Sequence, residues 1–285
     1  MMKLSFCTMG YLEYVTCEEA VRRIAQLGYK AVDFWAYAPH LGPDIYDKGD
    51  RKEMRKLVKS LNLEISGLSV AGGALGLHLN LSHSNPKVRR CAIQYYKDCV
   101  ELAVDVGSPL VNIISGMRVY GTTFEQAWKW NREGIEEIVD AAENTDVLLA
   151  LHTLTPCESN VMVTLEDTMR MMKEVNSKKL KLLIDTADQN VTEPVLYSDI
   201  KTVAKDLVYV HVNDNMGERR GDIHWPLGRG NINWELFFKT LKEVGYDGHL
   251  LVQVHSVGYP IDIDGWAYQS KKYLDNILDK LEIEH

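Results

Sequence analysis

The chain has 285 residues, of which 46% are hydrophobic and 25% are charged, and its formal net charge is −8. This composition is typical of a folded globular protein rather than a disordered one, and the length suits two average domains or one α/β barrel. The acidic balance disfavours a nucleic-acid backbone as the partner, and no run of about 18 apolar residues predicts a membrane span.

Short apolar, β-branched runs alternate with longer amphipathic segments along the chain. The amphipathic segments predict helices that include 17–28, 50–62, 88–107 and 234–245, and Gly28, Gly107 and Gly245 stand where helix-terminating glycines are expected. Strands are predicted at 3–8, 30–36, 64–70, 109–115, 147–152, 180–185, 207–211 and 249–254.

Near-continuous apolar strands that alternate with helices indicate a parallel sheet covered on both faces. Eight such units favour a single (β/α)8 TIM barrel of the α/β class over an open doubly wound sheet, and no glycine-rich phosphate loop follows the first strand. No linker or composition shift interrupts the chain, so we expect residues 1–285 to form one domain. The longest connections, 71–86 and 213–231, are expected to border a pocket.

The cysteines and the N-terminal residues help to predict the cellular compartment of the protein. The segment MMKLSFCTMG lacks the charged and apolar regions of a secretory leader. The odd cysteine count and the lack of a C-x-x-C pair argue against a disulfide framework and against a thiolate zinc site; the cysteines are Cys7, Cys17, Cys91, Cys99 and Cys157. We therefore expect a cytoplasmic protein.

A polar residue ends each of the last four apolar runs. His152 closes VLLALH, Asp185 closes LKLLID, His211 closes LVYVH, and Gln253 closes HLLVQ. In a closed parallel barrel the carboxyl ends of the strands converge on one mouth, where such enzymes place their chemistry. Imidazole and carboxylate groups are ordinary ligands of divalent metals. We therefore predict that these four residues surround a metal ion.

At these positions the chain resembles the xylose isomerase-like barrels, also called sugar phosphate isomerases/epimerases. It is most similar to the ketose 3-epimerases, including the fructoselysine 3-epimerase type, in stretches such as GYKAVDFWA, LHTLTPCESNVMV, VYVHVND and HWPLGRGNINW. The resemblance implies one divalent ion, commonly Mn²⁺, held by Glu, Asp, His and Glu at the ends of strands five to eight. It also implies that the two glutamates act as acid and base. His152 and Gln253 stand where those glutamates belong.

Both replacements change the expected chemistry. The ligand set would carry only the charge of Asp185 in place of three negative charges. Among Mn, Co, Zn and Mg, the imidazole of His152 favours Zn or Co, because Mn and Mg prefer carboxylate oxygen. Gln253 cannot accept and return a proton, so the two-glutamate relay is not available. One-base chemistry remains open, with His152 or Glu158 taking and returning the proton.

Further residues are expected at the mouth. Glu158, in the CESN turn, matches an acid that supports substrate and metal in the family, and His224, before WPLGRG, matches a histidine of the strand-seven loop. His255, two residues beyond Gln253, is another candidate for the same mouth, whereas Asp188 is noted only as close in sequence to a ligand position.

Aromatic and basic residues near the mouth suggest substrate contacts. Trp35, after the second strand, is expected to stack on a sugar ring, although such aromatic residues more often pack in the core. One arginine of the strand-seven loop, among Arg219, Arg220 and Arg229, could bind an anionic sugar or a phosphate. In the resemblance Arg229 replaces an acid, and we take it as the candidate substrate contact.

The leading hypothesis is a metal-dependent isomerase or epimerase that enolises a ketose or sugar derivative, with His152, Glu158 and Gln253 as candidate catalytic residues. The alternatives are a paralogue that binds a sugar or a partner without turnover and a lyase or dehydratase on the same scaffold. An apurinic-site endonuclease is least favoured because it needs more metal ligands and a basic surface. The expected partner is a small-molecule sugar, and the resemblance leaves a homodimer or homotetramer open.

Overall fold

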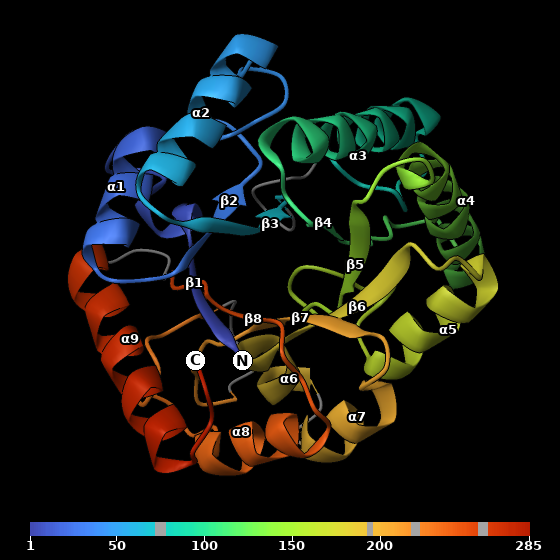
Figure 1. Ribbon diagram of the computed structural model, residues 1–285. Coiled ribbons are helices and arrows are strands. Elements are labelled where there is room, and N and C mark those ends of the chain that lie inside the picture. The colour runs from blue at the N-terminus through green and yellow to red at the C-terminus, as the bar shows by residue number, and fades with distance from the viewer. Residues whose placement is uncertain (72–77, 193–195, 218–222, 256–261) are drawn as a thin grey trace.

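The computed structural model describes residues 1–71, 78–192, 196–217, 223–255 and 262–285. Within these ranges eight parallel strands form a closed barrel in chain order, and the last strand pairs with the first (Figure 1). The strands are β1 (Lys3–Cys7), β2 (Ala31–Trp35), β3 (Glu64–Ser69), β4 (Leu110–Ile113), β5 (Leu148–His152), β6 (Leu180–Asp185), β7 (Leu207–His211) and β8 (His249–Val252). The predicted barrel is confirmed, with strand ends within a few residues of expectation.

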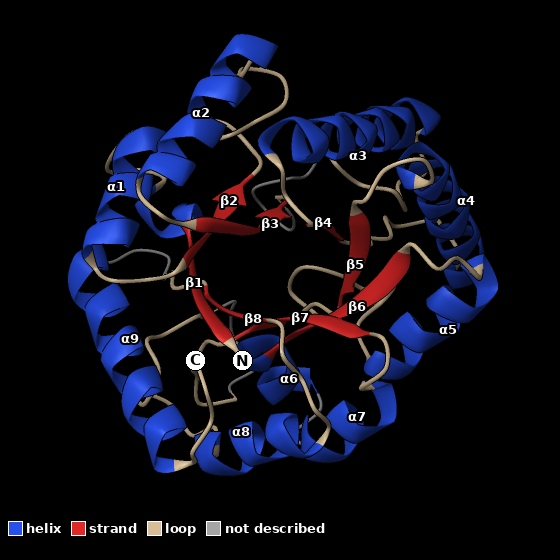
Figure 2. Ribbon diagram, in the orientation of Figure 1, coloured by secondary structure: helices blue, strands red, loops and turns tan. Residues whose placement is uncertain are grey.

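Helices surround the barrel and separate its strands from solvent (Figure 2). They are η1 (Thr8–Tyr11), α1 (Cys17–Gln26), α2 (Lys48–Ser60), α3 (Pro86–Val106), α4 (Phe124–Ala142), α5 (Leu165–Val175), α6 (Thr186–Thr192), α7 (Leu196–Val203), α8 (Trp234–Glu243) and α9 (Ile263–Lys280). The helix α6 lies nearer the barrel than α7 and α8 (Figure 1). The first residue of α6, Thr186, directly follows Asp185, the last residue of β6.

Local sequence explains where the helices begin and end. The hydroxyl groups of Thr16, Thr123 and Thr164 accept hydrogen bonds from backbone N–H groups in the first turns of α1, α4 and α5. Gly107 ends α3 with a φ of 85°, a conformation that glycine adopts without a Cβ clash. Gly28 and Gly245 also have positive φ after α1 and α8, so the predicted terminating glycines are confirmed.

The barrel interior has its own hydrophobic cluster, distinct from the larger core between strands and helices. Its buried members are Cys7, Leu110, Ala150, Leu183, Tyr209 and Leu251. A buried polar network crosses this interior: the Tyr209 hydroxyl donates to Asp33 Oδ2 at 2.9 Å, and the Cys7 thiol donates to Asp33 Oδ1 at 3.2 Å. Burial raises the pKa of Asp33 to about 7. The interior is therefore packed, with a buried acid below the mouth.

Among the residues described, no helix has the length and apolar character needed to cross a membrane.

Candidate active site

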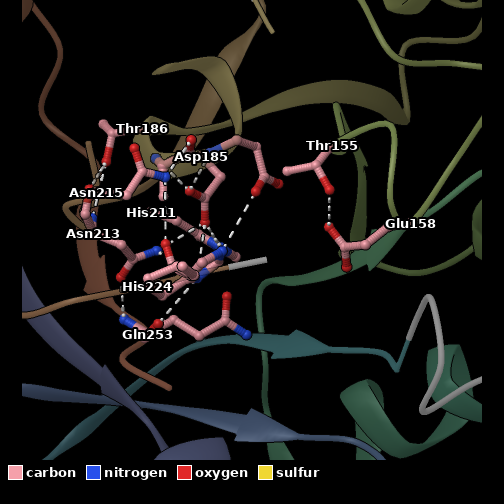
Figure 3. Close-up of polar contacts among 12 residues, drawn as sticks. Thr155, Glu158, Asp185, Thr186, His211, Asn213, Asn215, His224 and Gln253 are labelled. Carbon is pink, nitrogen blue, oxygen red and sulfur yellow. Dashed lines mark hydrogen bonds and ion pairs between the residues drawn. The ribbon is translucent and has the colours of Figure 1, made fainter. Parts of the chain in front are cut away.

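Three of the predicted ligands meet where their strands end. His152, Asp185 and His211 are the last residues of β5, β6 and β7, and Asp185 pairs directly with His211 in the register of the sheet. All three are buried, and one potential ligand atom from each lies within 4.8 Å of the others. Figure 3 shows Asp185 and His211 pointing toward one another across this space. The set offers two imidazoles and one carboxylate, which suits zinc and related divalent ions.

The electrostatics of Asp185 and His211 suit a metal ligand pair. Burial acts to raise the pKa of the Asp185 carboxyl, but the charges of the neighbouring His224, His211 and His152 rings outweigh burial and lower it. Burial lowers the pKa of His211 against the opposing effect of Asp185. An ionised carboxylate and a neutral imidazole are the forms that bind metal.

The hydrogen bonding of the His211 ring nitrogens bears on whether the site fits a metal ion. His211 Nδ1 lies 3.3 Å from Asp185 Oδ2, yet neither nitrogen of the buried His211 ring makes a hydrogen bond to the part of the chain that is described. Buried polar atoms in native proteins are normally hydrogen-bonded or bound to a metal. The residues at this position therefore fit a cation.

Gln253 follows β8 and is buried, but its side-chain amide points away from His152, Asp185 and His211. Its Nε2 lies 3.4 Å from Met9 Sδ and 3.9 Å from Cys7 Sγ, on the β1 side of the mouth. The backbone of Gln253 stays close to the cluster, because its N–H donates to Asn213 Oδ1 at 2.8 Å.

Asp188 lies in the first turn of α6 and is almost fully buried. Its carboxylate lies between two histidines, with Oδ2 3.2 Å from His152 Nε2 and Oδ1 3.4 Å from His224 Nε2. Its place three residues after Asp185 in the sequence did not by itself predict a role. Asp185 starts this turn of helix by accepting hydrogen bonds from the N–H groups of Ala187, at 2.8 Å, and Asp188, at 3.3 Å.

His224, predicted as a substrate contact, is buried within the same cluster. Its Nδ1 lies 3.2 Å from the Gln253 carbonyl oxygen and 3.1 Å from Asn213 Nδ2. The centroid of its ring lies 4.4 Å from that of His255, with the two ring planes tilted by 37°, and an antiparallel bridge joins the two residues. Both histidines therefore lie at the mouth, and His224 lies close to Asp185 and Asp188.

Asn213 was missed by the sequence analysis. Its Nδ2 donates to Asp185 Oδ2 at 2.9 Å, and its Oδ1 accepts from the Gln253 backbone (Figure 3). It thus connects the ends of β6, β7 and β8. The alternation of a strand could have found it, since Tyr209, His211 and Asn213 are two residues apart and share the inward face.

The remaining candidates have hydrogen-bond partners other than the three predicted ligands. Glu158 is half-buried, accepts a hydrogen bond from Thr155 Oγ1 at 3.3 Å, and lies apart from Asp185 in Figure 3. Trp35 is buried at the end of β2, and its indole N–H has no hydrogen-bond acceptor among the residues described. Arg229 is exposed and donates to Gln269 Oε1 on α9 at 2.7 Å. Arg219 and Arg220 lie outside the described residues.

Comparison with known proteins agrees with this architecture. The family described as xylose isomerase-like TIM barrel matches residues 21–277, which is most of the chain. The chain belongs to this family. The predicted resemblance is therefore confirmed at the level of the family.

Relatives within the xylose isomerase-like family include sugar epimerases. The chain is 25% identical over 254 residues to fructoselysine 3-epimerase of Shigella flexneri, covering 89% of this chain and 90% of the relative. It is 25% identical over 252 residues to ketose 3-epimerase of Arthrobacter globiformis, covering 87% of this chain and 80% of the relative. The solved structure of an L-ribulose 3-epimerase superposes with a TM-score of 0.84 at 18% identity, covering 99% and 96%. This last likeness shows the shared fold.

Proposed function

We propose that this protein is a metal-dependent isomerase or epimerase that acts on a ketose or a related sugar derivative by enolisation. The observation that carries the proposal is the convergence of His152, Asp185 and His211 at the carboxyl ends of three adjacent strands. The names of the relatives, fructoselysine, ketose and L-ribulose 3-epimerases, support a sugar with a carbonyl group as the substrate class. A bound divalent cation would polarise the carbonyl and hydroxyl oxygens of such a sugar.

Each residue of the site is assigned a separate role in the proposed reaction. Asp185 and His211 hold the ion, and both side chains are enclosed by the barrel. His152 is a ligand or a base, and the half-buried carboxylate of Glu158 would move a proton at the carbon beside the carbonyl. The side-chain amide of Gln253 does not gain or lose a proton at ordinary pH, so Gln253 would act by hydrogen bonding. The unsatisfied indole N–H of Trp35 supports its proposed contact with a sugar.

Incorporation of solvent deuterium tests the proposal. The purified protein is loaded with Zn²⁺, Co²⁺, Mn²⁺ or Mg²⁺ and incubated in D₂O with a panel of ketoses, and label is sought by NMR at the carbon beside the carbonyl. We expect exchange that EDTA abolishes. Asp185→Asn should also abolish exchange, whereas Asp206→Asn, a matched change at a surface acid that pairs with Lys181, should retain it.

Other outcomes would contradict the proposal. Binding of a sugar without exchange would indicate a paralogue that binds without turnover. Release of water or of a fragment would indicate a lyase or dehydratase. Exchange that persists after removal of all divalent metal would refute the role given to Asp185 and His211.

A further inference from the structure

Two sulfur atoms fix the orientation of the Gln253 side-chain amide. Its Nε2 lies 3.4 Å from Met9 Sδ and 3.9 Å from Cys7 Sγ. Met9 Sδ carries no proton and can only accept a hydrogen bond, so the amide must turn its NH₂ group, and not its oxygen, toward Met9. The Cys7 thiol donates its proton to Asp33 Oδ1 at 3.2 Å, so the Cys7 sulfur also faces Gln253 as an acceptor. The protein therefore occupies the nitrogen end of this amide.

The oxygen end of the same amide is left for a ligand. The Gln253 backbone is anchored, because its N–H donates to Asn213 Oδ1 at 2.8 Å and its carbonyl oxygen lies 3.2 Å from His224 Nδ1 (Figure 3). Gln253 Oε1 makes no hydrogen bond within the described residues, and Gln253 keeps an exposed fraction of 6% at the mouth. An amide oxygen only accepts hydrogen bonds. The ligand group that meets Gln253 must therefore be a donor.

Trp35 offers the opposite hydrogen-bonding character nearby on the mouth. The strands β8, β1 and β2 are consecutive in the barrel, so Gln253, Met9 and Trp35 follow one another around the strand ends. Trp35 lies two residues after Asp33 and shares its inward face. The Trp35 indole is buried, and its N–H, which can only donate, finds no acceptor among the residues described. Because an unpaired buried donor is costly, this N–H also indicates a ligand.

We propose, building on the sugar isomerase or epimerase function above, that Gln253 Oε1 and the Trp35 indole N–H form the hydroxyl-binding side of the substrate site. Met9 and Cys7 are positioning residues that hold the Gln253 amide for this contact. A hydroxyl group both donates and accepts, so it satisfies an amide oxygen and an indole N–H alike. A carboxylate or a fully ionised phosphate has no proton to donate to Gln253. The uncharged hydroxyl-bearing part of the sugar therefore lies at β8, β1 and β2, whereas the predicted metal ligands come from β5, β6 and β7.

NMR spectroscopy of the sugar-free protein tests the orientation of the amide. The protein is labelled with ¹⁵N in its glutamine side chains and with ¹³C in its methionine methyl groups, and Gln253→Leu and Met9→Leu identify the two signals by removing them. We expect a nuclear Overhauser effect between the Gln253 NH₂ protons and the Met9 methyl group. These protons should also exchange with solvent more slowly than those of the exposed Gln126.

Variants of Cys7 separate positioning from packing. Cys7→Ala should accelerate exchange of the Gln253 NH₂ protons, because the sulfur acceptor is lost. Cys7→Ser should keep the protection, because a hydroxyl still donates to Asp33 and accepts from Gln253. Cys99→Ala, a change at another buried cysteine, should leave the Gln253 signal unchanged. A missing Overhauser effect together with exchange as fast as in Gln126 would overturn the orientation.

Sugar binding tests the hydroxyl contacts. The Zn²⁺-loaded protein is titrated with D-fructose, D-tagatose and L-ribulose, and dissociation constants are measured by saturation-transfer NMR. Gln253→Leu and Trp35→Phe each remove one hydrogen-bonding atom and should weaken binding by about 2–10-fold. Cys7→Ala should weaken binding by about 2–10-fold, because a freely rotating amide must be ordered when the sugar binds. In the Gln253→Leu background, Cys7→Ala should cause no further loss, since Cys7 acts through Gln253.

The outcomes distinguish this inference from the proposed function. Additive losses for Cys7→Ala and Gln253→Leu would overturn the positioning role. Wild-type affinity in both Gln253→Leu and Trp35→Phe would overturn the hydroxyl contacts and leave the proposed function standing. Weakened binding in these variants without deuterium exchange in the wild type would support the contacts and refute the enzymatic reaction. A wild-type protein that binds none of the three sugars would refute both. Trp35→Phe keeps an aromatic ring, so it serves as the test if Gln253→Leu does not fold.

Discussion

The buried acid inside the barrel predicts an unusual dependence of stability on pH. Asp33 is fully buried, and the Tyr209 hydroxyl and the Cys7 thiol, which both donate hydrogen bonds to its carboxylate, are neutral groups. Burial raises the pKa of Asp33 from 3.8 to about 7 in the folded protein. The folded state therefore holds this proton more tightly than the unfolded chain does, and the contribution of Asp33 to the free energy of unfolding falls as the pH rises between about 4 and 7.

The size of this effect follows from the pKa change. At about 1.4 kcal/mol for each pH unit, a rise from 3.8 to about 7 corresponds to at most about 4 kcal/mol. Asp33→Asn replaces the acid with a neutral amide of the same shape, which does not titrate. Relative to the wild type, the free energy of unfolding of Asp33→Asn should therefore increase by up to about 4 kcal/mol between pH 4 and pH 8.

Urea unfolding of the metal-free protein, followed by tryptophan fluorescence at several pH values, measures this difference. Ser66→Ala is the matched control, because it removes a hydroxyl that contacts Tyr209 in the same network but introduces no change in titration. Its effect should be the same at every pH. A difference between Asp33→Asn and wild type that does not vary with pH would refute the reasoning.

Three further predictions concern the metal and the packing around it. Zn²⁺ at about 100 times its dissociation constant should raise the free energy of unfolding by about 2.7 kcal/mol relative to protein in EDTA, and equal thermal midpoints would exclude binding to the folded state. Gly67→Ala should cost about 1–3 kcal/mol in urea unfolding, because its Cβ would lie 2.8 Å from Leu110 Cδ1 and 2.9 Å from Asp33 Oδ2; an unchanged midpoint would mean that these side chains can move aside. Asn213→Ala removes a hydrogen bond to Asp185 and should weaken Co²⁺ binding by about 10–100-fold, whereas a titration matching wild type would show that this bond does not orient the ligand.

The sequence was sufficient to predict the barrel and three of its mouth residues. Near-continuous apolar runs at regular intervals specify buried parallel strands, and a closed barrel brings the carboxyl ends of those strands together. His152, Asp185 and His211 each end such a run, so their convergence follows from the chain order alone. The helix ends were also predictable where Gly28, Gly107 and Gly245 take positive φ.

Only the tertiary structure decided what the neighbouring side chains contact. Gln253 ends its apolar run in the same way, yet its amide turns to Met9 and Cys7, which come from the opposite end of the chain. Asp188 lies on a short helix, and its approach to His152 depends on how α6 packs against the end of β5. Strand periodicity determines which way a residue faces, whereas the direction of a long side chain depends on partners that are distant in sequence and meet only when the barrel closes.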